Sequence, residues 1–303
     1  MNKNTLKLIM KDPTRLFQMF ADNGLLTWMP DEMFLKIIYQ NKLHKKLNLD
    51  EPQTFNEKLQ WLKLYNRKPE YTRMVDKFEA KKYVSERIGE QYIIPTLGVW
   101  DCFDQINFDI LPNQFVLKCT HDSGGLVICR DKKGINKEKI RKKIQKCMKK
   151  NYYWLGREWP YKNVKPRIIA EEYMEDKSGG LTDYKFYCFN GKPEFLYIST
   201  GMENHKTARI SFVTMDWEFA PFGRTDYKPF DILPGKPKNF DKMVEIAGEL
   251  SKGHPFLRVD LYEVDAKIYF SELTFSPNAG MMPFEPECYD KMLGDMLVLP
   301  SRQ

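Results

Sequence analysis

The chain of 303 residues lacks the short motifs that mark several common enzyme classes. It has neither G-x-G-x-x-G nor the P-loop pattern G-x-x-x-x-G-K-[ST], and it has no kinase H-R-D triplet. An Asp-x-Asp pair, the metal motif expected at a nucleotide-sugar site, is also missing. With only four histidines, no Ser/His/Asp set for nucleophilic catalysis stands out. Activities built on these motifs are therefore disfavoured.

Paired cysteines and long apolar runs are missing as well. The six cysteines are scattered without a C-x-x-C pair, which argues against a disulfide framework or a zinc site. No apolar stretch approaches the length of a membrane-spanning helix, and the start shows no secretory signal. We therefore expect a cytoplasmic globular protein. Its formal net charge of +7 is compatible with anionic partners such as a nucleotide, an acidic polysaccharide or a membrane surface.

The order of secondary-structure patterns predicts the fold class. Helical spacing of apolar residues dominates up to about residue 75, and Thr54 and Glu57 have the spacing of a capping box. Strand patterns follow, and the strongest hairpin signal is Asn190-Gly191 between two apolar strands. A basic helix is expected over 132–150. Helices followed by mixed, mostly antiparallel strands predict an α+β fold.

The C-terminal hairpin is the most informative segment. Arg258 and Asp260 lie on one face of a strand, because side chains alternate with period two. A turn at 264–267 would place Glu272 on the returning strand beside Asp260. Adjacent carboxylates repel unless a cation neutralises them, and oxygen ligands suit Mg²⁺ with bound phosphates. The alternative is an edge hairpin with incidental surface charge.

A glycine-containing loop follows the predicted strand at 115–119. Backbone without Cβ can approach a ligand closely, and successive N–H groups in such a loop can cradle phosphate oxygens. A lysine on the strand could add charge to the same phosphates. An ordinary hairpin turn is the alternative. The residues concerned are Lys118, Ser123, Gly124 and Gly125.

Two further segments carry candidate ligand-binding residues. The exit of an apolar strand can pair its backbone with an adenine edge while neighbouring side chains pack on the ring; it could also be a strand ending in solvated acids. The residues at this exit are Glu171, Glu172, Tyr173 and Met174. On the next strand, Lys185 beside Asp183 could bind nucleotide phosphates or form a surface ion pair.

Taken in order, these segments resemble the ATP-grasp superfamily. More specifically, the chain resembles the TupA-like ATP-grasp proteins of teichuronopeptide biosynthesis, often encoded with capsule or surface-polysaccharide genes and sometimes labelled glycosyltransferases. The resemblance covers about 55–293. The segments that carry it are Asp76-Lys77, Lys118 with Ser123-Gly-Gly, Asp183-Tyr-Lys185-Phe and Glu272-Leu-Thr274-Phe-Ser-Pro.

The resemblance implies an ATP-grasp fold in which two α+β subdomains clasp ATP. An N-terminal helical extension would cover 1–75. The N-terminal subdomains, with the glycine loop and the adenine hinge, would cover 76–175. The C-terminal subdomain with the Mg²⁺ site would cover 176–303.

The resemblance also implies a role for each candidate residue. Arg258 and Lys185 would be catalytic: Arg258 would stabilise the transferring phosphoryl group, and Lys185 would contact the phosphates. The nucleotide would be bound by Lys118, the Ser123, Gly124 and Gly125 loop, the hinge Glu171, Glu172, Tyr173 and Met174, and Asp183 near the ribose. Mg²⁺ would be held by Asp260 and Glu272. Because Thr274 stands where an Asn is usual, Asn278 would be the substitute ligand.

The implied activity is ATP-dependent ligation of an amine or amino acid to a carboxylate through an acyl phosphate. The carboxylate would belong to a uronic acid of an acidic sugar or polysaccharide precursor. A glycan kinase, a polysaccharide glycosyltransferase and a non-enzymatic polyanion-binding module remain alternatives. No nucleic-acid partner is expected. The basic segment 132–150 could hold the protein at the inner face of the membrane, and the oligomeric state stays open.

Overall fold

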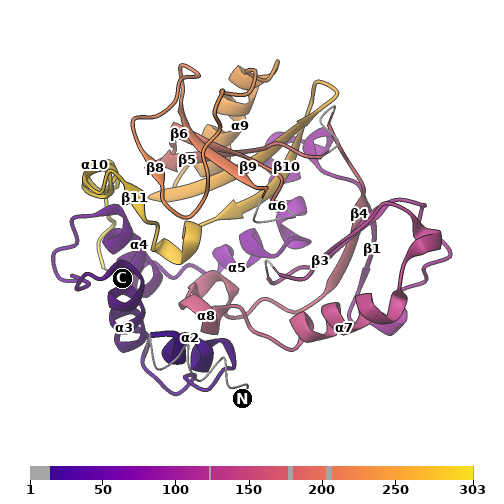
Figure 1. Cartoon of the computed structure of the whole chain (residues 1–303), viewed down its shortest axis with the longest axis horizontal. Coiled ribbons are helices and arrows are strands. Elements are labelled where there is room, and N and C mark those ends of the chain that lie inside the picture. The colour runs from indigo at the N-terminus through magenta and orange to yellow at the C-terminus, as the bar shows by residue number, and fades with distance from the viewer. Residues whose placement is uncertain (1–13, 123, 177–179, 203–206, 303) are drawn as a thin grey trace.

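A computed structural model describes residues 14–122, 124–176, 180–202 and 207–302 (Figure 1). Ser123 of the predicted glycine loop lies outside these ranges, as does the first part of the predicted helical extension. No helix in the described ranges combines the length and the hydropathy needed to cross a bilayer. All six cysteines lie within these ranges, and each is a free thiol.

The N-terminal part is helical, as predicted. Its described helices are α2 (Thr14–Asp22), α3 (Asp31–Leu43), α4 (Phe55–Tyr65), α5 (Glu70–Val75) and α6 (Glu79–Ile88). The predicted capping box is confirmed at α4: the Thr54 hydroxyl accepts from the Glu57 amide, and the Glu57 carboxylate accepts from the Thr54 amide at 3.0 Å. These bonds satisfy amides that the first turn of a helix otherwise leaves unpaired.

A four-stranded antiparallel sheet follows. Its strands are β1 (Thr96–Trp100), β2 (Phe115–Cys119), β3 (Leu126–Cys129) and β4 (Ile168–Glu172), in the order β1-β4-β2-β3. α7 (Lys137–Met148) packs on it through Ile140 and Ile144. The helix predicted over 132–150 is therefore shorter than expected. Asn136 caps α7 by accepting from the Lys139 amide, and only a 3-10 turn at Lys132–Gly134 precedes it.

A five-stranded antiparallel sheet forms the second half. Its strands are β5 (Asp183–Phe189), β6 (Lys192–Thr200), β7 (Arg209–Thr214), β9 (Phe256–Val264) and β10 (Lys267–Thr274), in the order β10-β9-β5-β6-β7. The predicted hairpin is confirmed: Asn190 (φ 50°) and Gly191 (φ 84°) join β5 to β6, and two positive φ values suit a tight hairpin turn. Antiparallel sheets with helices on their faces confirm the α+β class.

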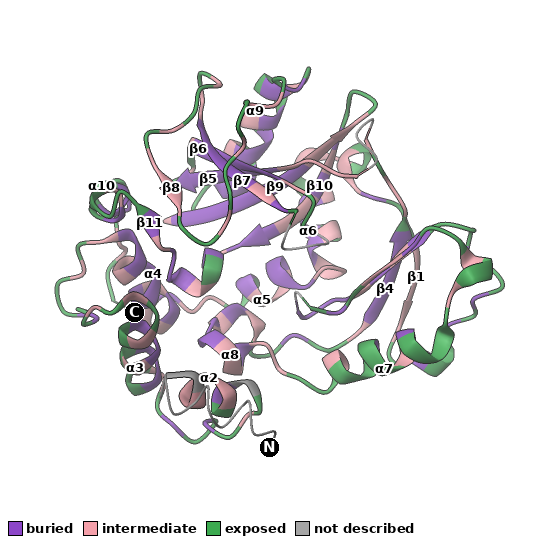
Figure 2. Ribbon diagram, in the orientation of Figure 1, coloured by how far each residue is buried: buried purple, intermediate pink, exposed green. Residues whose placement is uncertain are grey.

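Each face of the second sheet is covered (Figure 2). Alternate side chains of β5, such as Phe186, pack with α9 (Phe240–Ser251) and α6. The opposite face, which carries Tyr187, packs against Phe55 of α4 in a cluster of aromatic rings. The chain is completed by α8 (Tyr153–Gly156), α10 (Cys288–Met296), β8 (Gly223–Arg224) and β11 (Phe284–Glu285), together with the 3-10 turns Glu90–Tyr92, Phe103–Gln105, Trp159–Tyr161 and Pro277–Gly280.

The two sheets are connected near one end. α5 and α6 lie between them in Figure 1, and the segment after α6 reaches β10 through a bridge from Ile93 to Phe270. The Lys77 amide donates to the Thr120 carbonyl after β2, at 3.0 Å. These contacts hold the end of the first sheet opposite the charged face of the second.

Below neutral pH, folding stability should depend on His254. This side chain is 5% exposed and packs against Tyr71 and Phe275. Burial, aided by Lys68 and Arg87, lowers its pKa from 6.5 to about 4. The unfolded state therefore binds the proton first, so stability falls as the pH drops from 6.5 toward 4, by about 3 kcal/mol in total.

Urea denaturation across this pH range measures the effect. His254→Phe keeps the ring packing and removes the titration, so its stability curve should be flatter between pH 6.5 and 4. Parallel curves for the two proteins would contradict this assignment.

Candidate active site

Three cavities that share lining residues adjoin one another, and together they are called the cleft. The hinge cavity is defined by Val116, Ile128, Glu171, Met174 and Leu181. The central cavity contains Gly125, Lys185 and Ser271, and it shares Lys118, Leu126, Asp183, Met202 and Tyr262 with the hinge cavity. The N-terminal cavity contains Lys42, Glu158, Arg258 and Asn278, and it shares Lys77 and Glu272 with the central cavity. Predicted residues from both sheets therefore meet in one cleft.

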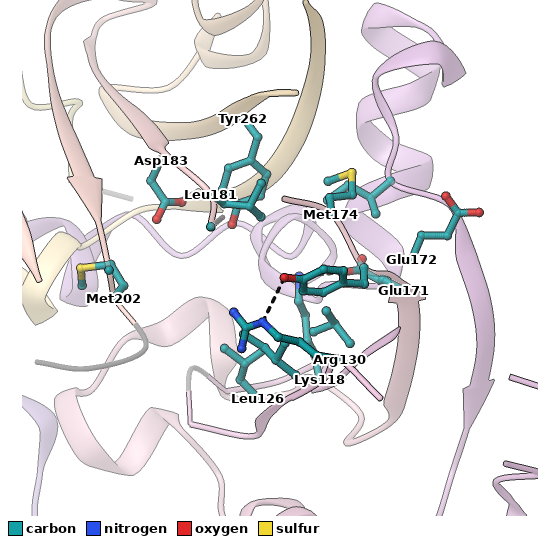
Figure 3. Close-up of a pocket in the computed structure, with 16 residues that line it drawn as sticks. Lys118, Leu126, Arg130, Glu171, Glu172, Met174, Leu181, Asp183, Met202 and Tyr262 are labelled. Carbon is teal, nitrogen blue, oxygen red and sulfur yellow. Dashed lines mark hydrogen bonds and ion pairs between the residues drawn. The ribbon is translucent and has the colours of Figure 1, made fainter. Parts of the chain in front are cut away.

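The hinge cavity is an apolar slot with a polar rim (Figure 3). Val116, Ile128 and Leu181 provide apolar walls, and Met174 lies where the chain leaves β4. Tyr173 also lines the cavity, and its hydroxyl accepts a hydrogen bond from Arg130 at 3.1 Å. Glu172 lies at the rim and is exposed. Such a slot can bind a flat ring on its apolar faces and pair the ring's edge with backbone groups.

Glu171 is buried at the border of the hinge cavity and holds two lysines. Its carboxylate lies 2.5 Å from the ammonium groups of Lys118 on β2 and Lys81 on α6. Burial opposes ionisation of Glu171, but the two lysines outweigh it and lower the pKa of this carboxyl to about 2. The side chain of Glu171 therefore orients Lys118 toward the cleft. Only the backbone of Glu171 is then left for the predicted pairing with an adenine edge. Lys81 was not among the predicted site residues, although it lies four residues after Lys77 in the sequence.

The glycine loop joins β2 to β3 beside the central cavity. The Gly125 amide donates to the Asp122 carboxylate at 2.9 Å, and Lys77 donates to the Asp122 carbonyl at 2.7 Å. A Cβ on Gly125 would lie 2.4 Å from the Cys119 sulfur, so the loop needs a glycine there. At Gly124 the nearest atom would be 3.9 Å from such a Cβ. The described part of the loop thus brings the Gly125 backbone to the central cavity, and the phosphate cradle stays a prediction.

The charged face of the second sheet is built by strand register. Lys185 of β5 pairs with Asp260 of β9, which pairs in turn with Glu272 of β10. The sequence prediction that Glu272 lies beside Asp260 is confirmed. Lys185 donates to Asp183 at 3.0 Å and to Asp260 at 2.6 Å.

Arg258 binds Asp260 with two hydrogen bonds, both 2.7 Å long. Asp260 is 0% exposed, so these charges neutralise one another inside the protein. Burial disfavours the charged forms of the two cations. Even so, Asp183 and Asp260 hold the pKa of Lys185 well above its usual value. Asp260 does the same for the pKa of Arg258. Both cations stay charged at the floor of the cleft.

Glu272 is the acidic group best placed to meet a metal ion. Its side chain is 34% exposed, lines two of the cavities and accepts a hydrogen bond from Arg258 at 3.0 Å. Burial opposes its ionisation, but Lys77 and Arg258 lower the pKa of Glu272 to about 2. Thr274 also accepts from Arg258, at 3.0 Å.

The donor set fits a single Mg²⁺ that shares its shell with phosphates. Such ions take one or two carboxylates together with phosphates and water. The described ranges contain no cluster of three acidic, histidine or cysteine side chains. The Asp260 oxygens are engaged by Arg258 and Lys185, so binding a metal would require Asp260 to give up one of these bonds. Asn278 is exposed, lines the N-terminal cavity and donates to the Met281 carbonyl, which leaves its amide oxygen as the ligand atom.

A buried carboxyl group and a buried amino group near the N-terminal cavity were missed by the sequence predictions. Glu158 lines this cavity and is 5% exposed, and burial raises its pKa against the opposing charges of Lys63 and Arg258. Burial lowers the pKa of Lys63, and this side chain donates to the carbonyls of Gly156 and Ala279. Glu158 therefore holds a proton more readily than an exposed glutamate does. No local motif announced it, because Lys63 and Glu158 meet only in the folded chain.

Comparison with known proteins points to one family. The model of the TupA-like ATPgrasp family matches residues 57–298. No curated protein matches the chain.

Solved structures with a similar arrangement include a ligase, an ATP-grasp protein and a synthetase. D-alanine–D-alanine ligase from Bacillus anthracis, complexed with ATP, aligns at 14% identity over 74% of this chain and 63% of that chain, with a TM-score of 0.40. The chain thus spans less than two thirds of that ligase. A RimK domain ATP-grasp protein from Sphaerobacter thermophilus aligns at 13% identity over 77% and 70% of the chains, with a TM-score of 0.41. D-cycloserine synthetase DcsG aligns at 15% identity over 75% and 71%, with a TM-score of 0.39.

The family assignment rests on the matched segment, which begins in α4, spans both sheets and ends just after α10. It contains every predicted site residue. The chain belongs to the TupA-like ATP-grasp family.

Proposed function

We propose that the protein is an ATP-dependent carboxylate–amine ligase that joins an amine or amino acid to a uronic acid of a surface-polysaccharide precursor. The observation that carries this proposal is the succession of three adjoining cavities. They lead from an apolar slot, past a floor of fixed cations, to the cavity lined by the buried Glu158. Such a sequence of environments suits a nucleotide base, its phosphates and an acceptor.

In this proposal the predicted residues have the following roles. Adenine binds in the hinge cavity against 171–174, with Asp183 near the ribose. The phosphates meet Lys118, Lys185 and the loop formed by Ser123, Gly124 and Gly125. Mg²⁺ held by Glu272, with Asp260 and Asn278 as further ligands, would neutralise phosphate charge. The proposed division into 1–75, 76–175 and 176–303 assigns these tasks to the helical extension and the ATP-grasp subdomains.

The proposed reaction has two steps. A carboxylate oxygen of the acceptor attacks the γ-phosphorus, and the bond to the ADP oxygen breaks. The amine nitrogen then attacks the acyl carbon, and inorganic phosphate leaves with the electron pair of the broken C–O bond. Arg258 and Lys185 offset the negative charge on the transferring group, so positioning and charge supply the catalysis. Glu158 lies where the proton released by the amine could be taken up.

ADP release tests the proposal. The purified protein is supplied with ATP, Mg²⁺ and a uronic acid, with and without amino acids. We expect release to require the carboxylate, and hydroxylamine in place of the amine to yield a hydroxamate. Product formation unaffected by Asp260→Ala or Glu272→Ala would contradict the mechanism.

The same assay separates the alternatives. A kinase would give a stable phosphate ester and no hydroxamate, and it would need no amine. A glycosyltransferase would consume a nucleotide sugar instead of ATP. We propose that the reaction takes place in the cytoplasm, at its membrane face if the precursor is membrane-bound.

A further inference from the structure

A basic groove lies outside the cleft, between α7 and the turn after α2. Figure 1 shows α8 between α2 and α7. The groove encloses about 600 Å³. Its described lining residues are Ala21, Asn23, Gly24, Lys142, Gln145, Lys146, Lys149, Lys150, Asn151, Trp154 and Leu155. Four of these are lysines, and none of the described ones is acidic.

The groove lysines share one face of the helix and its end. Lys142, Lys146 and Lys149 are spaced by four and three residues, so their side chains stand next to one another. Two other basic residues of α7 have partners: Arg141 pairs with Asp104, and Lys143 donates to the Leu126 carbonyl. Within the described part of the chain, the groove lysines form no ion pair. Like charges at this spacing destabilise a helix, and a bound polyanion would relieve the repulsion.

The other lining groups favour a sugar polymer over a bilayer. Trp154 offers an aromatic side chain whose ring is approached by the Arg157 guanidinium at 4.5 Å. Gln145 and Asn151 add amides that can donate to and accept from hydroxyl groups. Only Ala21 and Leu155 are apolar and aliphatic, which gives a membrane little to bury. A concave groove lined by the Trp154 ring and by the amides of Gln145 and Asn151 suits pyranose units that carry carboxylates.

The groove adjoins the cleft at one residue. Leu155 lines both the groove and the N-terminal cavity, and Tyr152 lies on the cavity side of it. A chain lying in the groove would therefore place its next unit near Lys42 and Arg258 in the N-terminal cavity.

We propose that the basic groove is an exosite for an acidic polysaccharide, which binds the units next to the one that enters the N-terminal cavity. The acceptor would then be an oligomer of uronic acid and not a free sugar; this part rests on the proposed function. Occupancy of the groove by a polyuronate does not depend on catalysis.

Calorimetric titration with an oligogalacturonate of about ten units, without ATP, tests the exosite. The triple variant Lys142→Glu, Lys146→Glu and Lys149→Glu should bind about tenfold more weakly or worse, because counterion release scales with the charges neutralised. The control triple variant Lys228→Glu, Lys238→Glu and Lys267→Glu changes net charge equally on exposed lysines of the other half. It should bind within about twofold of the parent. Thermal melting verifies that both variants fold.

Three results would overturn the proposal. Equal weakening in the control variant would mean that net charge alone is responsible. Binding of the oligomer no tighter than galacturonate monomer would remove the extended site. Binding to phosphatidylglycerol vesicles without binding to oligogalacturonate would assign the lysines to a membrane surface. If the oligomer binds at the groove but no uronate yields a hydroxamate, the exosite stands and the proposed ligase reaction falls.

Discussion

Replacing Arg258 with alanine should lower the rate of ADP release about 10³-fold, the range seen when an arginine on a transferring phosphoryl group is removed. Arg258 is the only side chain in the described cleft that contacts Asp260, Glu272 and Thr274 together. Its loss removes positive charge where the proposed reaction develops negative charge. The affinity for ATP should change much less, because the hinge cavity is formed by other residues.

The experiment must separate an effect of the substitution on catalysis from an effect on folding. Without Arg258, buried Asp260 keeps only Lys185 as a cation, and breaking a buried pair costs about 3–5 kcal/mol. Rates are therefore measured below the melting temperature of the variant. Arg258→Lys retains the charge but loses the paired hydrogen bonds, and it should have intermediate activity. Arg224→Ala is the control, since Arg224 pairs with Asp226 away from the cleft. A folded Arg258→Ala protein with more than about a tenth of parental turnover would exclude the proposed role.

Phe55→Ala should cause a large loss of stability, about 3–5 kcal/mol in the free energy of unfolding. Phe55 is 0% exposed at the start of α4, and its ring lies 5.0 Å from that of Phe256 and 5.5 Å from that of Phe189. Truncation would leave a cavity between α4 and the second sheet that rigid neighbouring rings cannot fill. Urea denaturation measures the loss.

A surface phenylalanine provides the matched control for this change. Phe219 is 45% exposed, so Phe219→Ala should shift stability by less than about 0.5 kcal/mol. In Phe55→Ala, the rise in melting temperature on adding ATP should persist, because α4 does not line the hinge cavity. Similar stabilities for the two variants would show that the α4 contact contributes little.

Local patterns were enough to predict the N-terminal helices, the Asn190-Gly191 turn and the C-terminal hairpin. Alternation on β9 and the turn at 264–267 predict that Asp260 and Glu272 lie on neighbouring strands. The regular register set by the turn would pair Asp260 with Ser271, and a bulge between Phe270 and Glu272 brings Glu272 opposite Asp260 instead. The predicted start of α7 was wrong. Basic residues occur on both sides of Gly134 and so do not mark where the helix begins, whereas the capping residue Asn136 does.

Pairings between distant segments could not be predicted in this way. Lys81 and Glu171 come from a helix and a strand whose packing is set by the whole core. The raised pKa of Glu158 arises from burial, which depends on the folded chain and not on its neighbours in the sequence. Composition and residue spacing do not report how deeply the folded chain buries a side chain.

The N-terminal cavity is lined by two parts of the chain, and only one of them lies within the segment that matches the family model. Arg258, Glu272 and Glu158 lie within the matched segment 57–298, whereas Gln18 and Lys42 on α2 and α3 precede it. Replacement of these helices would change the lining of the N-terminal cavity and would leave Arg258 and Lys185 untouched. Under the proposed function, acceptor choice would then diverge in evolution by exchange of an N-terminal segment, without loss of the residues proposed to carry the chemistry.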